Sequence, residues 1–151
     1  MVELDASQLR VGVAVASYNA FVTDGLLAGA LEFLKQAGCH DPQVVTVSGA
    51  LELPLVVRAL TRSGCDAVVA LAAVIEGETD HYTHVATQSY AGLRQVMLET
   101  DVPVGFGVLT TRDASQAKQR SEPGPGNRGA EAAEAAVRSA MVLRRLRSNH
   151  G

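Results

Sequence analysis

The sequence predicts an α/β fold, a flavodoxin-like three-layer α-β-α sandwich built on a parallel sheet of four main strands. Short apolar runs of β-branched and small residues alternate with segments of helical periodicity, which is typical of a parallel sheet with helices on both faces. The runs are also too continuously apolar for strands that keep one face in water. The 151 residues fit one domain, which we assign to residues 1–151.

The first half of the chain contains two strand–helix units. Residues 11–16 form an apolar run that predicts a buried strand, and residues 24–36 carry apolar side chains at helical spacing. Residues 44–47 predict the second strand. Residues 53–60 predict the second helix, with Pro54 near its start, where a missing N–H costs least.

The second half continues the alternation and then changes character. Residues 67–75 predict a strand, residues 84–98 a helix, and residues 103–109 a fourth strand. A short helix over residues 115–120 is followed by a run rich in Pro and Gly, which breaks helices. A long alanine-rich helix over residues 130–146 then closes the chain.

The composition excludes several classes of function. Charged residues make up 19% of the chain and the net charge is −3, so no general basic field exists to bind nucleic acid or anionic lipid. The longest apolar run, residues 67–75, is about half as long as a membrane-spanning helix requires. The acidic N-terminus is unlike a secretory signal, so the cytoplasm is the expected compartment. Cys39 and Cys65 lack the close spacing of a zinc site or a dithiol.

Polar residues follow each predicted strand. Open parallel sheets bind ligands at the carboxyl ends of their strands, so these residues are the candidates for a functional site. They are Tyr18 and Asn19, residues 49–52, residues 77–81, and Thr110 with Thr111.

His81 is the candidate for proton transfer, because it lies between a buried strand and a helix and imidazoles titrate near neutral pH. From position alone, a surface histidine without a role is an equal alternative. Glu76, Glu78, Asp80, His81 and His84 form a cluster of acidic and imidazole groups. A solvated acidic loop explains this cluster better than a divalent metal site does, so no metal is expected.

Two features indicate a phosphate site. Gly77, Glu78 and Thr79 precede a predicted helix, and backbone N–H groups at such positions cradle phosphate. Arg120 and Arg128 flank the breaker run and have the chemistry to clamp a phosphate, with ordinary surface arginines as the alternative. The sequence has neither a P-loop lysine motif nor a dinucleotide glycine fingerprint, so nucleoside triphosphates and nicotinamide cofactors are not expected.

Five blocks of the chain are similar to those of a known family, in the same order and at matching separations. The blocks are SYNAF (17–21), SGALELP (48–54), VIEGETDHY (74–82), FGVLTT (106–111) and GNRG (126–129). They resemble the 6,7-dimethyl-8-ribityllumazine synthase family of riboflavin biosynthesis over nearly the whole chain. The resemblance implies a transferase that condenses 5-amino-6-ribitylaminouracil with 3,4-dihydroxy-2-butanone 4-phosphate, releases phosphate and water, and uses no metal or organic cofactor.

The resemblance also implies roles for individual residues. Tyr18 would stack on the pyrimidine ring, with Asn19 beside it, and His81 would transfer protons. The ribityl chain would lie along Gly49, Ala50, Leu51 and Glu52, the ring against Val74 and Ile75, and the phosphate against Gly77, Glu78, Thr79 and Arg120. Phe106, Arg120 and Arg128 would reach the site from an adjacent subunit.

Several positions depart from the family pattern. Glu76 and Ser17 each stand where Arg is usual, and Leu51 stands where Phe is usual. The exchange at position 76, together with Glu78, adds negative charge beside the expected phosphate loop. A second hypothesis is therefore a catalytically weakened relative that forms a shell or binds flavins or lumazines. A third, a flavin mononucleotide carrier, lacks the phosphate loop expected after the first strand.

The resemblance further implies a homopentamer. The small residues of 130–140 offer a face for close helix packing around a five-fold axis. Six residues separate Arg120 from Asn127, as in shell-forming family members, while Pro123 and Pro125 constrain this linker. A free pentamer and a 60-subunit shell are equal alternatives.

Overall fold

The computed structural model describes residues 4–77 and 80–149, and its centre is a parallel four-stranded sheet. The strands are β1 (Val11–Ala16), β2 (Gln43–Val47), β3 (Ala67–Ile75) and β4 (Val104–Thr111), arranged in the order β2-β1-β3-β4. All three neighbouring pairs run parallel. The predicted α/β class and sheet are confirmed, and β1 and β3 have the predicted bounds.

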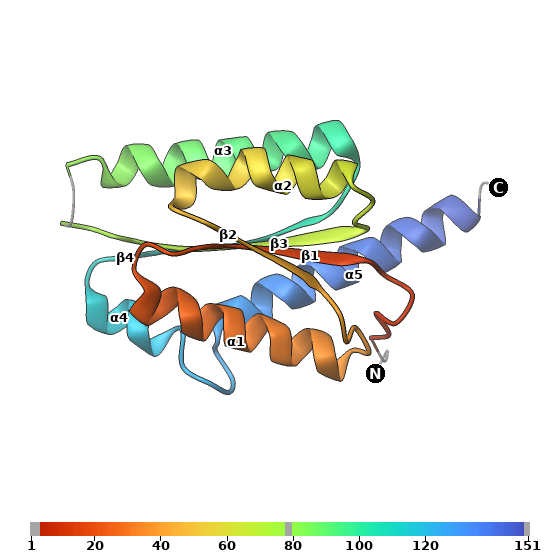
Figure 1. The fold of residues 1–151 in the computed structure, drawn as a ribbon, viewed down its shortest axis with the longest axis horizontal. Coiled ribbons are helices and arrows are strands. Elements are labelled where there is room, and N and C mark those ends of the chain that lie inside the picture. Colours follow the sequence, from red (N-terminus) through yellow and green to blue (C-terminus); the bar gives the residue numbers. More distant parts are fainter. Residues whose placement is uncertain (1–3, 78–79, 150–151) are drawn as a thin grey trace.

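Helices cover both faces of the sheet (Figure 1). One face carries α2 (Leu53–Arg62) and α3 (Tyr82–Thr100), and the other carries α1 (Ala20–Gln36), α4 (Ala114–Gln119) and α5 (Arg128–Ser148). A single 3₁₀ turn, η1 (Ala50–Glu52), leads into α2. Within the described part of the chain, none of the helices combines the length and apolar character that crossing a membrane requires.

The strand side chains alternate between two buried clusters. Val13, Val69 and Leu71 belong to the cluster beneath α1 and α5, and Ala14 and Ala70 to the cluster beneath α2 and α3. Because β1 and β3 are central and covered on both faces, almost every residue in them is buried. The two buried clusters, one on each face of the sheet, hold the carboxyl ends of the strands in place.

The structure adds packing detail that the sequence did not predict. β2 is an edge strand with alternating exposed residues, and Val44 is 41% exposed. A short apolar run does not distinguish an edge strand from a central one. Several small residues of α5 pack inside the chain: Ala133, Ala136 and Ala140 are buried in its own core, whereas Ala135 of the same helix is exposed.

Helix α1 begins at Ala20, four residues before its predicted start at residue 24. Asn19 precedes it with φ 62° and ψ 46°, a left-handed conformation that Asn tolerates better than most residues. The Asn19 carbonyl accepts the N–H groups of Val22 and Thr23, so the backbone starts the helix without a side-chain cap. The apolar spacing alone did not predict this early start. The hydrogen bonds to the Asn19 carbonyl fix the turn that follows β1.

Candidate functional site

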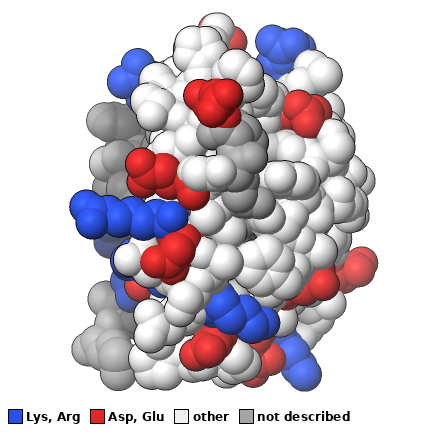
Figure 2. Space-filling model, turned by 90° about the vertical axis from the view of Figure 1, so that its left-hand side faces the viewer, with Lys and Arg blue, Asp and Glu red and all other residues white. Residues whose placement is uncertain are grey.

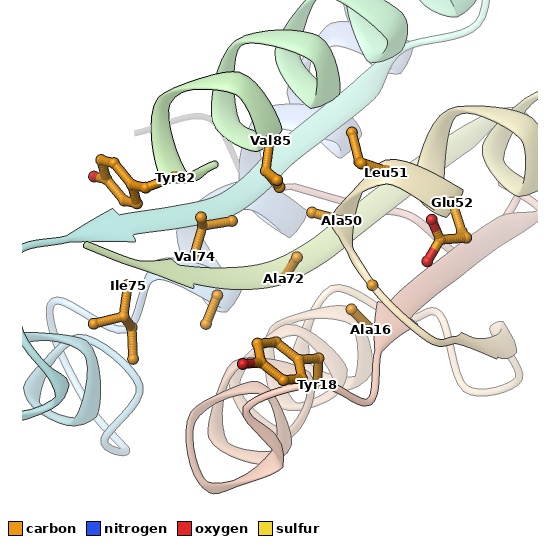
Figure 3. Close-up of a pocket in the computed structure, with 12 residues that line it drawn as sticks. Ala16, Tyr18, Ala50, Leu51, Glu52, Ala72, Val74, Ile75, Tyr82 and Val85 are labelled. Atoms are coloured by element: carbon orange, nitrogen blue, oxygen red, sulfur yellow. The ribbon is translucent and has the colours of Figure 1, made fainter. Parts of the chain in front are cut away.

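A pocket of about 190 Å³ opens at the carboxyl ends of β1 and β3 (Figure 3). Its walls come from the turn after β1, the η1 turn, the end of β3 and the start of α3. The residues that line it are Ala16, Tyr18, Gly49, Ala50, Leu51, Glu52, Ala72, Ala73, Val74, Ile75, Tyr82 and Val85. The pocket therefore brings together Tyr18, the 49–52 segment, Val74 and Ile75, which the sequence assigned to one site.

Tyr18 lies over this pocket on a turn that is fixed from both sides. The N–H groups of Ser17 and Tyr18 donate to the Val47 and Ser48 carbonyls at 2.8 and 3.0 Å, which continues the pairing of β1 with β2. Asn19 Nδ2 donates to the Ala73 carbonyl at 2.9 Å, which ties the turn to β3. Tyr18 is 55% exposed, and its side chain lies beside the pocket (Figure 3).

The segment from Gly49 to Glu52 is closed by its own hydrogen bonds. Ser48 Oγ donates to Glu52 Oε1 at 2.7 Å, and the Glu52 N–H donates to the Gly49 carbonyl at 3.3 Å. Ala50 is buried, whereas Leu51 is 52% exposed. The turn thus presents backbone groups and one exposed apolar side chain to the pocket.

The end of β3 leads from the pocket to His81. The Glu76 N–H donates to the Thr111 carbonyl at 2.8 Å. The sequence predicted that Thr110 and Thr111 follow the fourth strand, whereas they are the last two residues of β4. Gly77 has φ 90°, a left-handed turn that suits glycine. His81 is exposed and occupies the N-cap position of α3 without a side-chain cap hydrogen bond. It directly precedes Tyr82, a pocket residue, but is not among the residues that line the pocket. Glu78 and Thr79 lie outside the described residues.

Phe106, Arg120 and Arg128 line a different cavity. This second cavity, of about 700 Å³, lies along the edge strand β4 between α3 and α5. The Phe106 ring stacks on Tyr90 at a centroid distance of 6.2 Å and an interplanar angle of 15°. Tyr90 Oη donates to the Val108 carbonyl at 2.6 Å, which holds the stacked pair against β4.

The two cavities share no lining residue, so one chain does not bring all the predicted contacts together. The first cavity has Tyr18, residues 49–52, Val74 and Ile75, and the second has Phe106 and the two arginines. At about 190 Å³ the first cavity is also smaller than the roughly 300–1,000 Å³ typical of small-molecule sites. The residues that the resemblance assigned to one site are therefore divided between two cavities of a single chain.

The charges at this end of the sheet are mixed. Figure 2 shows acidic and basic side chains scattered over it, with a broad uncharged area between them. Glu76 and Asp80 are both exposed. Across residues 4–77 and 80–149, no three His, Cys, Asp or Glu side chains form a group that could hold a metal ion.

The two cysteines do not support a thiol-based reaction. Cys39 and Cys65 are buried and free. Burial raises the pKa of both thiols, so each stays protonated at neutral pH and is a poor nucleophile.

The sequence interpretation missed part of the pocket wall. Ala16, Ala72 and Ala73 lie inside the strands, and Tyr82 and Val85 form the first turn of α3. The position of Tyr82, directly after the candidate histidine in a chain with only three Tyr, was a usable signal. The alanines carried no signal, because small residues in a central strand look the same wherever they lie.

The fold and the site define an α/β protein with a pocket at the carboxyl ends of its parallel strands. A family model described as 6,7-dimethyl-8-ribityllumazine synthase matches residues 8–144. The chain belongs to this family.

Bacterial relatives that carry the same name are similar over nearly their whole length. The protein of Edwardsiella ictaluri is 48% identical over 147 residues, covering 95% of this chain and 94% of the relative. That of Levilactobacillus brevis is 48% identical over 141 residues, covering 91% and 90%. That of Nitratidesulfovibrio vulgaris is 40% identical over 147 residues, covering 95% and 94%.

Proposed function

We propose that this protein is a transferase that condenses 5-amino-6-ribitylaminouracil with 3,4-dihydroxy-2-butanone 4-phosphate to 6,7-dimethyl-8-ribityllumazine. The observation that carries the proposal is the convergence of Tyr18, residues 49–52, Val74 and Ile75 on one pocket at the carboxyl ends of the strands. Family membership over residues 8–144 gives the reaction.

The pocket suits a flat, polar ring with a hydroxylated chain. The pyrimidine stacks on the exposed side of Tyr18, against Val74 and Ile75, and Asn19 holds that turn through Ala73. The ribityl hydroxyls bond the backbone of Gly49, Ala50, Leu51 and Glu52. Aromatic stacking and a few placed polar groups are typical of small-molecule sites.

The chemistry needs positioning and proton transfer. An amine of the pyrimidine attacks the ketone and water leaves as the imine forms. Phosphate is then eliminated, which generates a second carbonyl after tautomerisation. The second amine attacks this carbonyl and closes the ring with loss of a second water. His81, between the end of β3 and the start of α3, supplies and accepts protons in these steps. Holding the two reactants together lowers the barrier because the reaction becomes effectively unimolecular.

The phosphate contacts come from two chains. Gly77, with Glu78 and Thr79, receives the phosphate in one subunit, and Arg120, Arg128 and Phe106 approach from its neighbour. Two observations support this arrangement: the arginines line a separate cavity, and the first cavity is too small for both substrates. A heterologous contact of this kind closes into a ring, here a homopentamer.

The ring has two further assembly options. The linker with Pro123 and Pro125 fits either a free pentamer or a 60-subunit shell made of pentamers, which sedimentation separates by size. The two free, buried thiols are compatible with the reducing cytoplasm, the compartment we propose.

One assay tests the proposed function. Purified protein is mixed with both substrates and the absorbance of the lumazine product is followed. We expect turnover that depends on both substrates. If no product forms although the folded protein binds the lumazine, the chain is instead the weakened, shell-forming or ligand-binding relative, an alternative that the exposed Glu76 favours.

A further inference from the structure

Asn127 is a buried polar residue at the junction of three helices. It lies between α4 and α5, is 2% exposed and caps α5 by accepting the Ala130 N–H at 3.0 Å. Its Nδ2 atom donates to the carbonyls of Gly25, Ser121 and Glu122 at 3.0–3.1 Å. One side chain thus joins α1, the end of α4 and the start of α5.

The surroundings of Asn127 are shaped to admit it. A Cβ atom on Gly29 would overlap the Asn127 amide, and one on Gly25 would overlap the Ser121 carbonyl. A Cβ on Gly129 would overlap the Leu26 carbonyl. Helix interiors disfavour glycine relative to alanine, and the close approach of Ser121 and Asn127 explains why Gly25 and Gly29 stand in α1.

The junction lies beside two residues that line the second cavity. Ser121 and Glu122, whose carbonyls Asn127 holds, directly follow Arg120, and Asn127 itself directly precedes Arg128. The Arg128 N–H donates to the Arg120 carbonyl at 2.9 Å. Both arginines line the second cavity. The backbones that carry the two guanidinium groups therefore meet beside the Asn127 side chain.

The intervening loop has little else to fix it. Residues 122–126 are all exposed, and Gly124 and Gly126 have φ values of 101° and 92°. A Cβ on either glycine would contact no other group within 4 Å. Pro123 and Pro125 restrict their own φ angles, but the two open glycines can adopt other conformations, so the shape of the loop also depends on the hydrogen bonds at its two ends.

We propose that Asn127 is a positioning residue, which sets Arg120 and Arg128 for the phosphate of the substrate bound by the neighbouring subunit. This inference rests on the proposed function, in which the arginines bind that phosphate. Asn127 acts through the arginines and contacts no substrate. Its side chain is short and buried, whereas Arg128 beside it is exposed.

Asn127→Ser separates this role from helix capping. Serine is a good N-cap and retains the bond to Ala130, but it cannot donate to the three carbonyls. We expect the KM for the butanone phosphate to rise about 10- to 100-fold, as when a binding group shifts by about 1 Å. The KM for the pyrimidine should change less than about twofold, because Tyr18 lines the first cavity and neither arginine does.

A second variant acts on the same junction from α1. Gly29→Ala displaces the Asn127 amide without changing either arginine, and we expect the same selective rise in KM. Leu34→Ala is the control, because Leu34 is fully buried and lines neither cavity. It should lower the melting temperature and leave both KM values unchanged.

Inorganic phosphate gives a readout without turnover. It should raise the melting temperature of the wild-type assembly and of Leu34→Ala, and raise that of Asn127→Ser much less. Equal changes in both KM values, or an unchanged phosphate effect in Asn127→Ser, would overturn the inference. A wild-type protein that turns over neither substrate would instead refute the proposed function.

Discussion

Replacing Tyr18 with alanine tests the proposed pyrimidine contact. The side chain is 55% exposed and belongs to neither buried cluster, so its removal should change the free energy of unfolding by less than about 0.5 kcal/mol. The effect should therefore appear in substrate binding rather than in stability.

The expected magnitude follows from the exposed area. If the pyrimidine covers the open part of the ring, about 100 Å² of surface leaves water, which at about 25 cal/mol per Å² contributes about 2.5 kcal/mol. This value lies within the range of about 1–3 kcal/mol that base–aromatic stacking contributes. We expect Tyr18→Ala to raise the KM for the pyrimidine about 10- to 100-fold and the KM for the butanone phosphate by less than about threefold.

Steady-state kinetics with each substrate varied in turn measures both values. Tyr18→Phe should stay within about threefold of wild type, because it retains the ring. Leu98→Ala serves as the matched exposed control, since Leu98 is 68% exposed and lines neither cavity. The reasoning fails if Tyr18→Ala leaves the pyrimidine KM unchanged or raises both KM values equally.

Further predictions concern the other groups. His81→Ala should lower kcat about 10²- to 10⁴-fold, and an unchanged kcat in the same assay would remove His81 from the mechanism. Arg120→Ala should raise the KM for the butanone phosphate much more than that for the pyrimidine, and equal effects would contradict a phosphate contact. Glu76→Gln removes an exposed negative charge and should lower the KM for the phosphate substrate about two- to fivefold, less so at high salt; a rise would refute this. Because burial raises the pKa of Cys39 and Cys65, their reaction with a thiol reagent near pH 8 should be slow until the chain is unfolded, and fast labelling of the native protein would contradict their burial.

The sequence predicted the central sheet well and its margins less well. β1 and β3 are buried on both faces, so their continuous apolar runs end where the strands end. β2 looked similar as a run, but its exposure follows from its place at the edge, which depends on strand order. The small residues of α5 likewise gave no indication of which surface they pack against.

The candidate site divides in the same way. Tyr18 and residues 49–52 directly follow strands, so topology alone brings them to one pocket. Arg120 directly follows α4 and Arg128 is the first residue of α5, and nothing in the spacing places them in a separate cavity. The hydrogen bonds of Asn127 were also beyond the sequence, because they join groups up to 102 positions apart.

Mixing two impaired variants tests the shared site most directly, when activity is assayed at a butanone phosphate concentration well below the KM of Arg120→Ala. His81→Ala and Arg120→Ala chains are unfolded, combined in equal amounts and reassembled. If each site takes His81 from one chain and Arg120 from the next around a ring, about one quarter of the sites regain both residues, so activity should recover to about one quarter of wild type. A mixture no more active than the mean of the two variants alone would contradict the account.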